Sequence, residues 1–266
     1  MKSALILRLL AVAVSTTAVL AEDAKTRLEK SPRHLEWVTV KHDNREVRCF
    51  IAYPEVKEKA TAVVVIHEIF GMTDWVRGVT DQLAEAGYIA IAPDLLSGAG
   101  PNGGGTESLG SGDGVRKAIF GLPSAQVTAD LDAVADFVGK LPAANGKVAA
   151  TGFCWGGGQV FKYATHNPHL AAVFPFYGTG PESVDDLKTI QSPVYGFYAG
   201  NDARVTATVP KTIEAMKQAG KVYQPVTYEG AGHGFMRAGE AADASPDNRK
   251  ARDQAWDRMK SYLNKL

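Results

Sequence analysis

The feature that most restricts the fold is a regular alternation of short buried runs and longer amphipathic segments. Residues 62–66 form an unbroken apolar run, which is typical of a strand buried on both faces of a sheet. Residues 74–86 then place Val76, Val79 and Leu83 on one helical face and end before Gly87, a residue type that often closes helices. This unit predicts a parallel sheet with crossover helices.

The same unit recurs along the chain. Two runs that flank a turn, 35–40 and 46–53, predict an opening hairpin. The later segments predict strands at 88–92, 148–151, 171–176, 194–198 and 225–228, and helices at 125–140, 156–167, 209–218 and 249–263. Repeated strand–helix units predict an α/β fold, in which a mostly parallel, doubly wound sheet carries helices on both faces.

The first residues predict export. Lys2 is followed by a short apolar stretch that ends in small residues at Ala21, before Glu22. This is the pattern of a secretory signal peptide over 1–21, although an uncleaved membrane anchor is the alternative. A polar segment over 22–34 and one domain over 35–266 would follow. We therefore expect a secreted or periplasmic protein with no stable membrane insertion after the signal is removed.

Charge excludes some partners. The chain has 29 basic and 29 acidic residues and no long block of one sign, so it shows no electrostatic footprint for nucleic acid. A small-molecule partner fits better, and we expect a monomer. The two cysteines, Cys49 and Cys154, could pair in an oxidising compartment. The setting of Cys154 favours a free thiol instead.

Cys154 lies in a predicted strand-to-helix turn of the kind that holds the catalytic nucleophile in other enzymes. The sequence Gly152-Phe153-Cys154-Trp155-Gly156 has the form of the nucleophile elbow GxSxG, with cysteine in place of serine. Glycine on both sides leaves room for so sharp a turn, and the following helix N-terminus favours a thiolate. A buried structural cysteine is the alternative interpretation.

Two later residues complete a catalytic set in the expected chain order. Asp202 follows the strand-like run at 194–198, and His233 follows the last one at 225–228. Nucleophile, acid and histidine in this order are typical of triads on this kind of sheet. His233 would take the thiol proton and later protonate the leaving group, while Asp202 would orient the imidazole ring.

The segment 97–114 is crowded with glycine and predicts a stretch that resists rigid structure. It follows the carboxyl end of a strand, where open α/β sheets bind ligands. A mobile lid and a tolerated surface insertion both fit this position. Its glycines do not form a phosphate-binding motif.

With these residues in view, the sequence resembles the dienelactone hydrolase family from about Leu35 to Leu263. Three motifs carry the resemblance: His67-Glu68-Ile69-Phe70-Gly71, Gly152-Phe153-Cys154-Trp155-Gly156-Gly157 and Ala231-Gly232-His233-Gly234-Phe235. The resemblance implies an α/β-hydrolase fold and a Cys154–His233–Asp202 triad, with no metal or other cofactor. It also implies that Glu68 holds the resting thiol and takes its proton when substrate binds.

The resemblance further implies an oxyanion hole formed by the backbone N–H groups of Ile69 and Trp155, and a substrate carboxylate bound by Arg237. The family's second arginine has no clear counterpart here, and Arg116 is the candidate taken for it. This departure leaves the substrate open.

These observations predict a cysteine-dependent hydrolase that opens dienelactone-like lactones or small carboxylic esters through a thioester acyl-enzyme. One alternative is a general short-chain esterase or thioesterase with a roomier pocket. Another is a binding or redox-responsive protein that keeps the fold without turnover. The intact set of Glu68, Cys154, Asp202 and His233 favours an enzyme.

Overall fold

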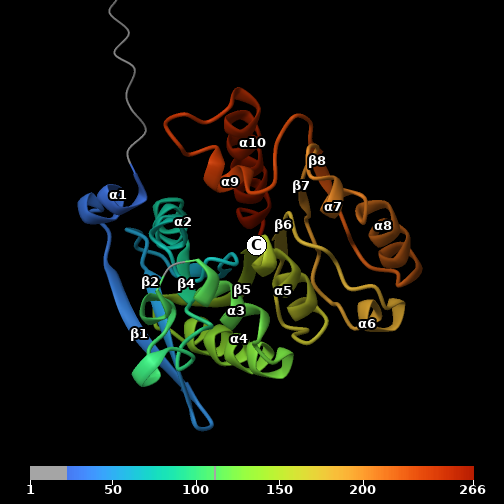
Figure 1. Cartoon of the computed structure of the whole chain (residues 1–266). Helices are drawn as coiled ribbons and strands as arrows, with labels where there is room; N and C mark the ends of the chain where they lie inside the picture. The colour runs from blue at the N-terminus through green and yellow to red at the C-terminus, as the bar shows by residue number, and fades with distance from the viewer. Residues whose placement is uncertain (1–22, 111) are drawn as a thin grey trace, which may run out of the picture.

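The computed structural model describes residues 23–110 and 112–266. Their centre is an eight-stranded sheet in the order β1-β2-β4-β3-β5-β6-β7-β8 (Figure 1). The antiparallel pairs β1–β2 and β2–β4 lie at one side and all other neighbours pair in parallel, which confirms the predicted sheet. The strands are β1 (Leu35–His42), β2 (Arg45–Ala52), β3 (Ala60–Ile66), β4 (Ile89–Pro93), β5 (Ala144–Phe153), β6 (Val173–Phe176), β7 (Phe197–Ala199) and β8 (Val226–Tyr228).

Two hydrophobic cores explain why the apolar run in β3 is unbroken. Val63 and Val65 belong to the core on one face of the sheet, whereas Val64 and Ile66 belong to the core on the other. Successive side chains of a strand point to opposite faces, so a strand that is covered twice needs apolar residues at every position. All seven β3 residues are buried.

Helices cover both faces of the sheet, as predicted (Figure 1). One face is covered by α2 (Asp74–Glu85), α9 (Phe235–Ala238) and α10 (Pro246–Leu263). The other is covered by α4 (Ser124–Gly139), α5 (Trp155–Ala164), α6 (Val184–Lys188) and α8 (Val209–Gln218). A further short helix, α7 (Ala203–Thr206), follows β7. Within the described ranges, no helix is long and apolar enough to cross a membrane.

The predicted signal peptide over 1–21 lies outside the described residues. The polar segment that follows it contains a helix, α1 (Ala24–Lys30), which the sequence pattern did not indicate. This helix and the residues after it are tied to the domain by ion pairs. Arg27 lies 2.7 Å from Glu240, and Arg33 lies 2.7 Å from Asp81 at the nearest atoms.

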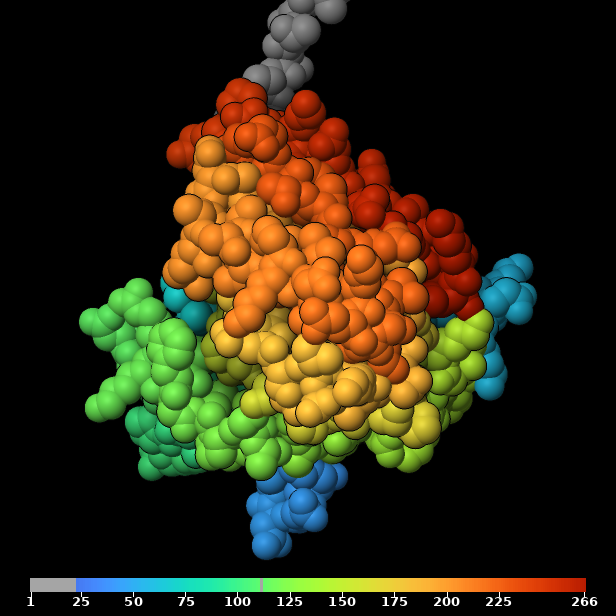
Figure 2. Space-filling view, turned by 90° about the vertical axis from the view of Figure 1, so that its right-hand side faces the viewer, coloured from blue at the N-terminus to red at the C-terminus, as the bar shows by residue number. Residues whose placement is uncertain are grey.

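The glycine-rich segment is more ordered than expected. It contains two 3₁₀ turns, η1 (Pro101–Gly103) and η2 (Thr106–Leu109), and it runs into α3 (Asp113–Phe120). Buried Asp94 fixes this segment, because its carboxylate accepts hydrogen bonds from the Thr106 backbone N–H at 2.8 Å and from the Thr106 hydroxyl at 2.7 Å. Two regular turns and the Asp94 hydrogen bonds therefore lie where the glycine content predicted a stretch that resists rigid structure. In Figure 2 this part of the chain, in green, protrudes from the body.

Candidate active site

Cys154 is positioned by the turn between β5 and α5. Its backbone has φ 55° and ψ −114°, a left-handed conformation that costs energy for any residue with a side chain. A Cβ atom on Gly152 would lie 2.1 Å from the Gly156 carbonyl oxygen, and one on Gly156 would lie 2.4 Å from the His67 carbonyl oxygen. The two glycines are therefore required by close backbone contacts, as the elbow motif predicts.

The fold brings Cys154, His233 and Asp202 together. His233 follows β8, and its Nε2 atom lies 3.0 Å from Cys154 Sγ. Its Nδ1 atom lies 2.5 Å from Asp202 Oδ2, so the carboxylate accepts the Nδ1 proton and fixes the ring. Asp202 is buried after β7 and also caps α7 through the Val205 N–H. The three side chains form a continuous chain of hydrogen bonds.

The surroundings of His233 raise the pKa of its imidazole ring. The hydrogen bond to Cys154 is the largest influence, and together with the Asp202 hydrogen bond it outweighs burial and raises the pKa of His233 to about 9. An imidazolium at neutral pH can pair with a thiolate at Cys154 and can later donate a proton.

Glu68 lies at the same site but contacts a different partner from the one expected. Its side chain is 4% exposed and accepts a hydrogen bond from Arg237 Nε at 2.9 Å. Burial raises the pKa of Glu68, and the charge of Arg237 opposes this rise. Among the described residues, no hydrogen bond joins Glu68 to Cys154. The expectation that Glu68 holds the thiol is not met in this arrangement, because the thiol faces His233.

The residues predicted to supply the oxyanion donors, Ile69 and Trp155, line the same cavity as Cys154. Trp155 is the first residue of α5, so its N–H group has no acceptor within the helix. Ile69 follows Glu68 in the loop after β3, and both residues line the same cavity as Cys154. The Cys154 N–H is already used, since it donates to the Phe176 carbonyl at 3.0 Å.

These residues surround a cavity of about 520 Å³. It is lined by Glu68, Ile69, Phe70, Phe120, Cys154, Trp155, Gly158, Gln159, Tyr177, Gly178, Thr179, Arg204, Val205, His233 and Arg237. Arg116 is absent from this lining, and its guanidinium pairs with Asp113 within α3. The prediction for Arg116 is thus not supported, because α3 directs that side chain to its own helix surface.

Arg204 and Tyr177 line the cavity but were not predicted from the sequence. Arg204 lies on α7, two residues after Asp202, and its proximity to the triad acid was a signal that could have identified it. Tyr177 follows β6 with φ 38°, and its ring lies 5.1 Å from that of His233. The Tyr177 hydroxyl is buried without a hydrogen-bond partner among the described residues. Burial and the charges of Glu68 and Cys154 raise its pKa well above the ordinary value.

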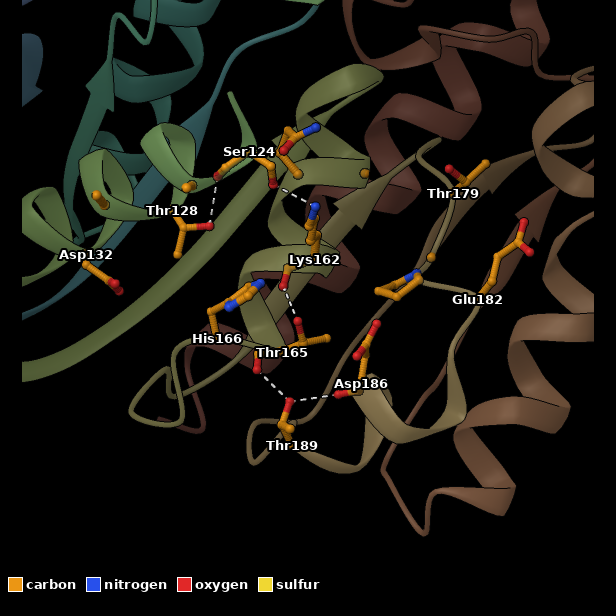
Figure 3. Close-up of a pocket in the computed structure, with 16 residues that line it drawn as sticks. Ser124, Thr128, Asp132, Lys162, Thr165, His166, Thr179, Glu182, Asp186 and Thr189 are labelled. Atoms are coloured by element: carbon orange, nitrogen blue, oxygen red, sulfur yellow. Dashed lines mark hydrogen bonds between the residues drawn. The ribbon is translucent and has the colours of Figure 1, made fainter. Parts of the chain in front are cut away.

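A larger hollow of about 1020 Å³ lies beside this cavity, between α4, α5 and the loop before α6 (Figure 3). It meets the cavity at Gly158, Gln159 and Thr179. Several of its polar groups are engaged with one another: Lys162 donates to Ser124 at 2.6 Å, and Thr165 donates to the Lys162 carbonyl at 2.7 Å. The hollow contains no member of the triad, so the smaller cavity is the candidate active site.

The two cysteines are separate thiols. Cys49 is buried in β2 and contacts the Val47 carbonyl at 3.5 Å, and burial raises its pKa far above the ordinary value. In the described parts of the chain, no group of three or more His, Cys, Asp or Glu side chains is arranged to hold a metal ion.

The amino-acid sequence is similar to those of known proteins. The model of the dienelactone hydrolase family matches residues 47–266. A Salmonella typhi protein provisionally named carboxymethylenebutenolidase is 33% identical, with 82% of each chain covered. An Escherichia coli protein with the same provisional name is 34% identical over 76% of this chain and 75% of its own.

The solved structures give the same answer for the fold. A Klebsiella pneumoniae structure, provisionally titled dienelactone hydrolase, superposes with a TM-score of 0.76 at 28% identity. It covers 88% of this chain and 99% of its own. The predicted α/β-hydrolase fold is therefore confirmed.

Proposed function

Because the chain belongs to the dienelactone hydrolase family, we propose that it hydrolyses carboxylate-bearing lactones or small carboxylic esters with Cys154 as the nucleophile. The observation that carries this proposal is the line of contacts from Cys154 through His233 to Asp202, at 3.0 and 2.5 Å. A thiol, a base and an orienting acid in this geometry are the parts that acyl transfer needs.

In the proposed acylation step, the Cys154 thiolate attacks the substrate carbonyl carbon and a C–S bond forms. The π electrons of the carbonyl move to its oxygen, where the N–H groups of Ile69 and Trp155 would stabilise the negative charge. The C–O bond to the leaving alcohol then breaks, and the alkoxide takes the Nε2 proton of His233. A thioester at Cys154 remains.

Deacylation reverses the roles. His233, now neutral, removes a proton from water as the water oxygen attacks the thioester carbon. The C–S bond breaks, the acid is released, and Cys154 leaves as a thiolate paired with the His233 imidazolium. Asp202 stabilises that imidazolium in both half-reactions.

Glu68 and Arg237 suggest how substrate would activate the site. A substrate carboxylate that binds Arg237 would compete with Glu68 for the same guanidinium. Loss of Arg237 would remove the main influence that lowers the pKa of buried Glu68. The released carboxylate would then be a stronger base beside Cys154, and any remaining thiol could be deprotonated only when substrate is present.

Arg204 provides a second cation for an anionic substrate. It lines the cavity, and none of the ion pairs found in the described chain uses it. Arg237 is already paired with Glu68 and lies 5.1 Å from the Phe70 ring. We therefore assign to Arg204, instead of Arg116, the role of second carboxylate-binding arginine.

A short-chain esterase is the second candidate, and the mouth of the cavity favours it. Phe70 and Phe120 line the cavity with exposed fractions of 37% and 70%. Such exposed aromatic side chains suit the apolar part of a neutral ester.

A substrate panel tests both candidates. We would assay cis- and trans-dienelactone, p-nitrophenyl acetate and p-nitrophenyl butyrate with wild type, Cys154→Ala and the matched control Cys49→Ala. The proposal expects lactone turnover that Cys154→Ala abolishes and Cys49→Ala retains, with a thioester trapped at Cys154 by mass spectrometry. Ester turnover alone would favour the esterase. No hydrolysis that depends on Cys154 would contradict both and favour a binding or redox-responsive protein.

We also propose export to the periplasm or the medium, on the residue pattern of 1–21. Mass spectrometry of the protein recovered from a bacterial periplasm would then show a mature chain that begins at Glu22. Recovery of the uncleaved chain from the membrane fraction would favour an anchor.

A further inference from the structure

His67 is a buried histidine that the proposed mechanism does not use. It follows the last residue of β3, directly before Glu68, and its side chain is inaccessible to solvent. Its ring stacks on that of Trp155, with centroids 5.5 Å apart and planes 14° apart. The histidine therefore contacts both segments that supply the proposed oxyanion donors.

The hydrogen bond of His67 fixes its tautomer. The Nδ1 atom lies 2.9 Å from the Glu68 carbonyl oxygen. A carbonyl oxygen can only accept, so Nδ1 carries the proton. The Nε2 atom is buried and has no partner among the described residues, and burial lowers the pKa of His67. The ring is thus a neutral imidazole whose one N–H points at the Glu68 carbonyl.

That carbonyl belongs to the same planar peptide group as the Ile69 N–H. In a trans peptide the two bonds point in opposite directions, so fixing the carbonyl also fixes the direction of the N–H. The Gly71 N–H donates to the same oxygen at 3.1 Å from the other side of the turn. Two donors therefore hold this peptide, and one of them is a side chain.

We propose that His67 is a positioning residue for the oxyanion hole: its Nδ1–H orients the Glu68–Ile69 peptide. The inference rests on the proposed function, since it concerns the charge that develops on the substrate carbonyl oxygen. A donor that is rotated away from that oxygen loses most of its stabilising effect in the transition state.

If His67 positions the oxyanion hole, its replacement should slow the attack of Cys154 on an ester but not the alkylation of Cys154. Attack on an ester places negative charge on the carbonyl oxygen. Alkylation by iodoacetamide forms an S–C bond at a saturated carbon and expels iodide, so no oxyanion develops. Attack on the ester therefore needs the oxyanion hole. The alkylation rate depends only on the amount of Cys154 thiolate and on its accessibility to iodoacetamide.

Two variants separate the hydrogen bond from the ring. His67→Phe keeps a ring to stack on Trp155 and removes the donor. His67→Asn loses the ring but can place its amide nitrogen near the Nδ1 position. We would measure the burst of p-nitrophenolate from p-nitrophenyl acetate and the rate of iodoacetamide alkylation for both variants and wild type. Circular dichroism would check folding, and Cys154→Ala would give the background.

For His67→Phe we expect acylation to fall about ten-fold, a fraction of the loss seen when an oxyanion donor is deleted. KM should change little and alkylation should stay within about two-fold of wild type. His67→Asn should recover most of the acylation rate. Equal slowing of both reactions, or no recovery by asparagine, would overturn the inference. A wild type that releases no p-nitrophenolate above the Cys154→Ala background would instead overturn the proposed function.

Discussion

The backbone of Cys154 stores strain that its neighbours must tolerate. A cysteine at φ 55° costs on the order of 1–3 kcal/mol. In this conformation its thiol lies 3.0 Å from His233 Nε2. The turn is possible only because Gly152 and Gly156 bring backbone atoms into contact. The conformation of Cys154 therefore depends on both glycines.

A substitution tests this requirement. Gly152→Ala would place a methyl group 2.1 Å from the Gly156 carbonyl oxygen, so the turn must shift. We expect a loss of about 3 kcal/mol in the free energy of unfolding and almost complete loss of hydrolysis. Gly78→Ala is the matched control, because its methyl would meet Ala24 at an ordinary 3.4 Å. Urea denaturation and ester assays compare the two, and a stable, active Gly152→Ala protein would contradict the steric argument.

The pKa of His233 predicts an alkaline limit for activity. The raised pKa of about 9 keeps the ring protonated at neutral pH, and the proton is lost as the pH rises through that value. Hydrolysis of alkyl esters, whose alkoxide must be protonated, should therefore fall above about pH 9, while p-nitrophenyl esters should be less affected. Asp202→Asn removes one of the influences that raise the pKa of His233. The fall in alkyl-ester hydrolysis should then begin at a lower pH. A kcat profile with the same limb for both ester types would refute this role.

The position of Arg204 predicts that its replacement weakens the binding of anionic substrates and not of neutral ones. Because it faces the cavity without an ion pair among the described residues, Arg204→Gln should raise KM for carboxylate-bearing lactones about ten-fold. Neutral p-nitrophenyl esters should be hydrolysed as before. Arg116→Gln is the control, since that side chain pairs with Asp113 on α3. Steady-state kinetics on both substrate classes decide, and equal KM changes for the two classes would exclude a carboxylate site at Arg204.

At the level of single elements, sequence patterns were informative wherever local chemistry determined the result. The β3 run predicted a doubly covered strand, and the glycines around Cys154 predicted the elbow. Asp202 and His233 could be placed at strand ends because a parallel sheet gathers these ends at one edge. Glu68 and Arg237 were placed by family resemblance, and they share the cavity.

The elements that were missed depend on partners far away in the sequence. Helix α1 is held by Glu240 and by contacts to α2, which no local pattern reveals. The glycine-rich segment is organised by Asp94, and α3 follows it with Arg116 turned to Asp113. Arg204 and Tyr177 reach the cavity through the paths of loops after β7 and β6.

The anchoring of the N-terminal segment predicts a measurable contribution to stability. Arg33 contacts Asp81 with exposed fractions of only 12% and 6%, so Arg33→Ala would leave a buried carboxylate without its cation. We expect a loss of about 3 kcal/mol in the free energy of unfolding. Lys25→Ala is the control, because its pair with Glu29 is 71% and 65% exposed and should contribute almost nothing. Equal midpoints in urea for the two variants would show that the segment is not anchored by this pair.

For the whole molecule, the sheet order places the reacting groups on separate stretches of the chain. Glu68 follows β3, Cys154 follows β5, Asp202 follows β7 and His233 follows β8. None of these positions is close to the next in sequence, yet the strand ends bring them to one cavity of about 520 Å³. The expected monomeric state stays a prediction, to be measured by light scattering of the purified protein.

This order also has a consequence for biosynthesis. The thiol of Cys154 leaves the ribosome 79 residues before the imidazole of His233. If Cys154 is the nucleophile, as proposed, the growing chain carries it without its base during that interval and would not yet cleave esters. Hydrolytic activity would then arise only when β8 joins the edge of the sheet.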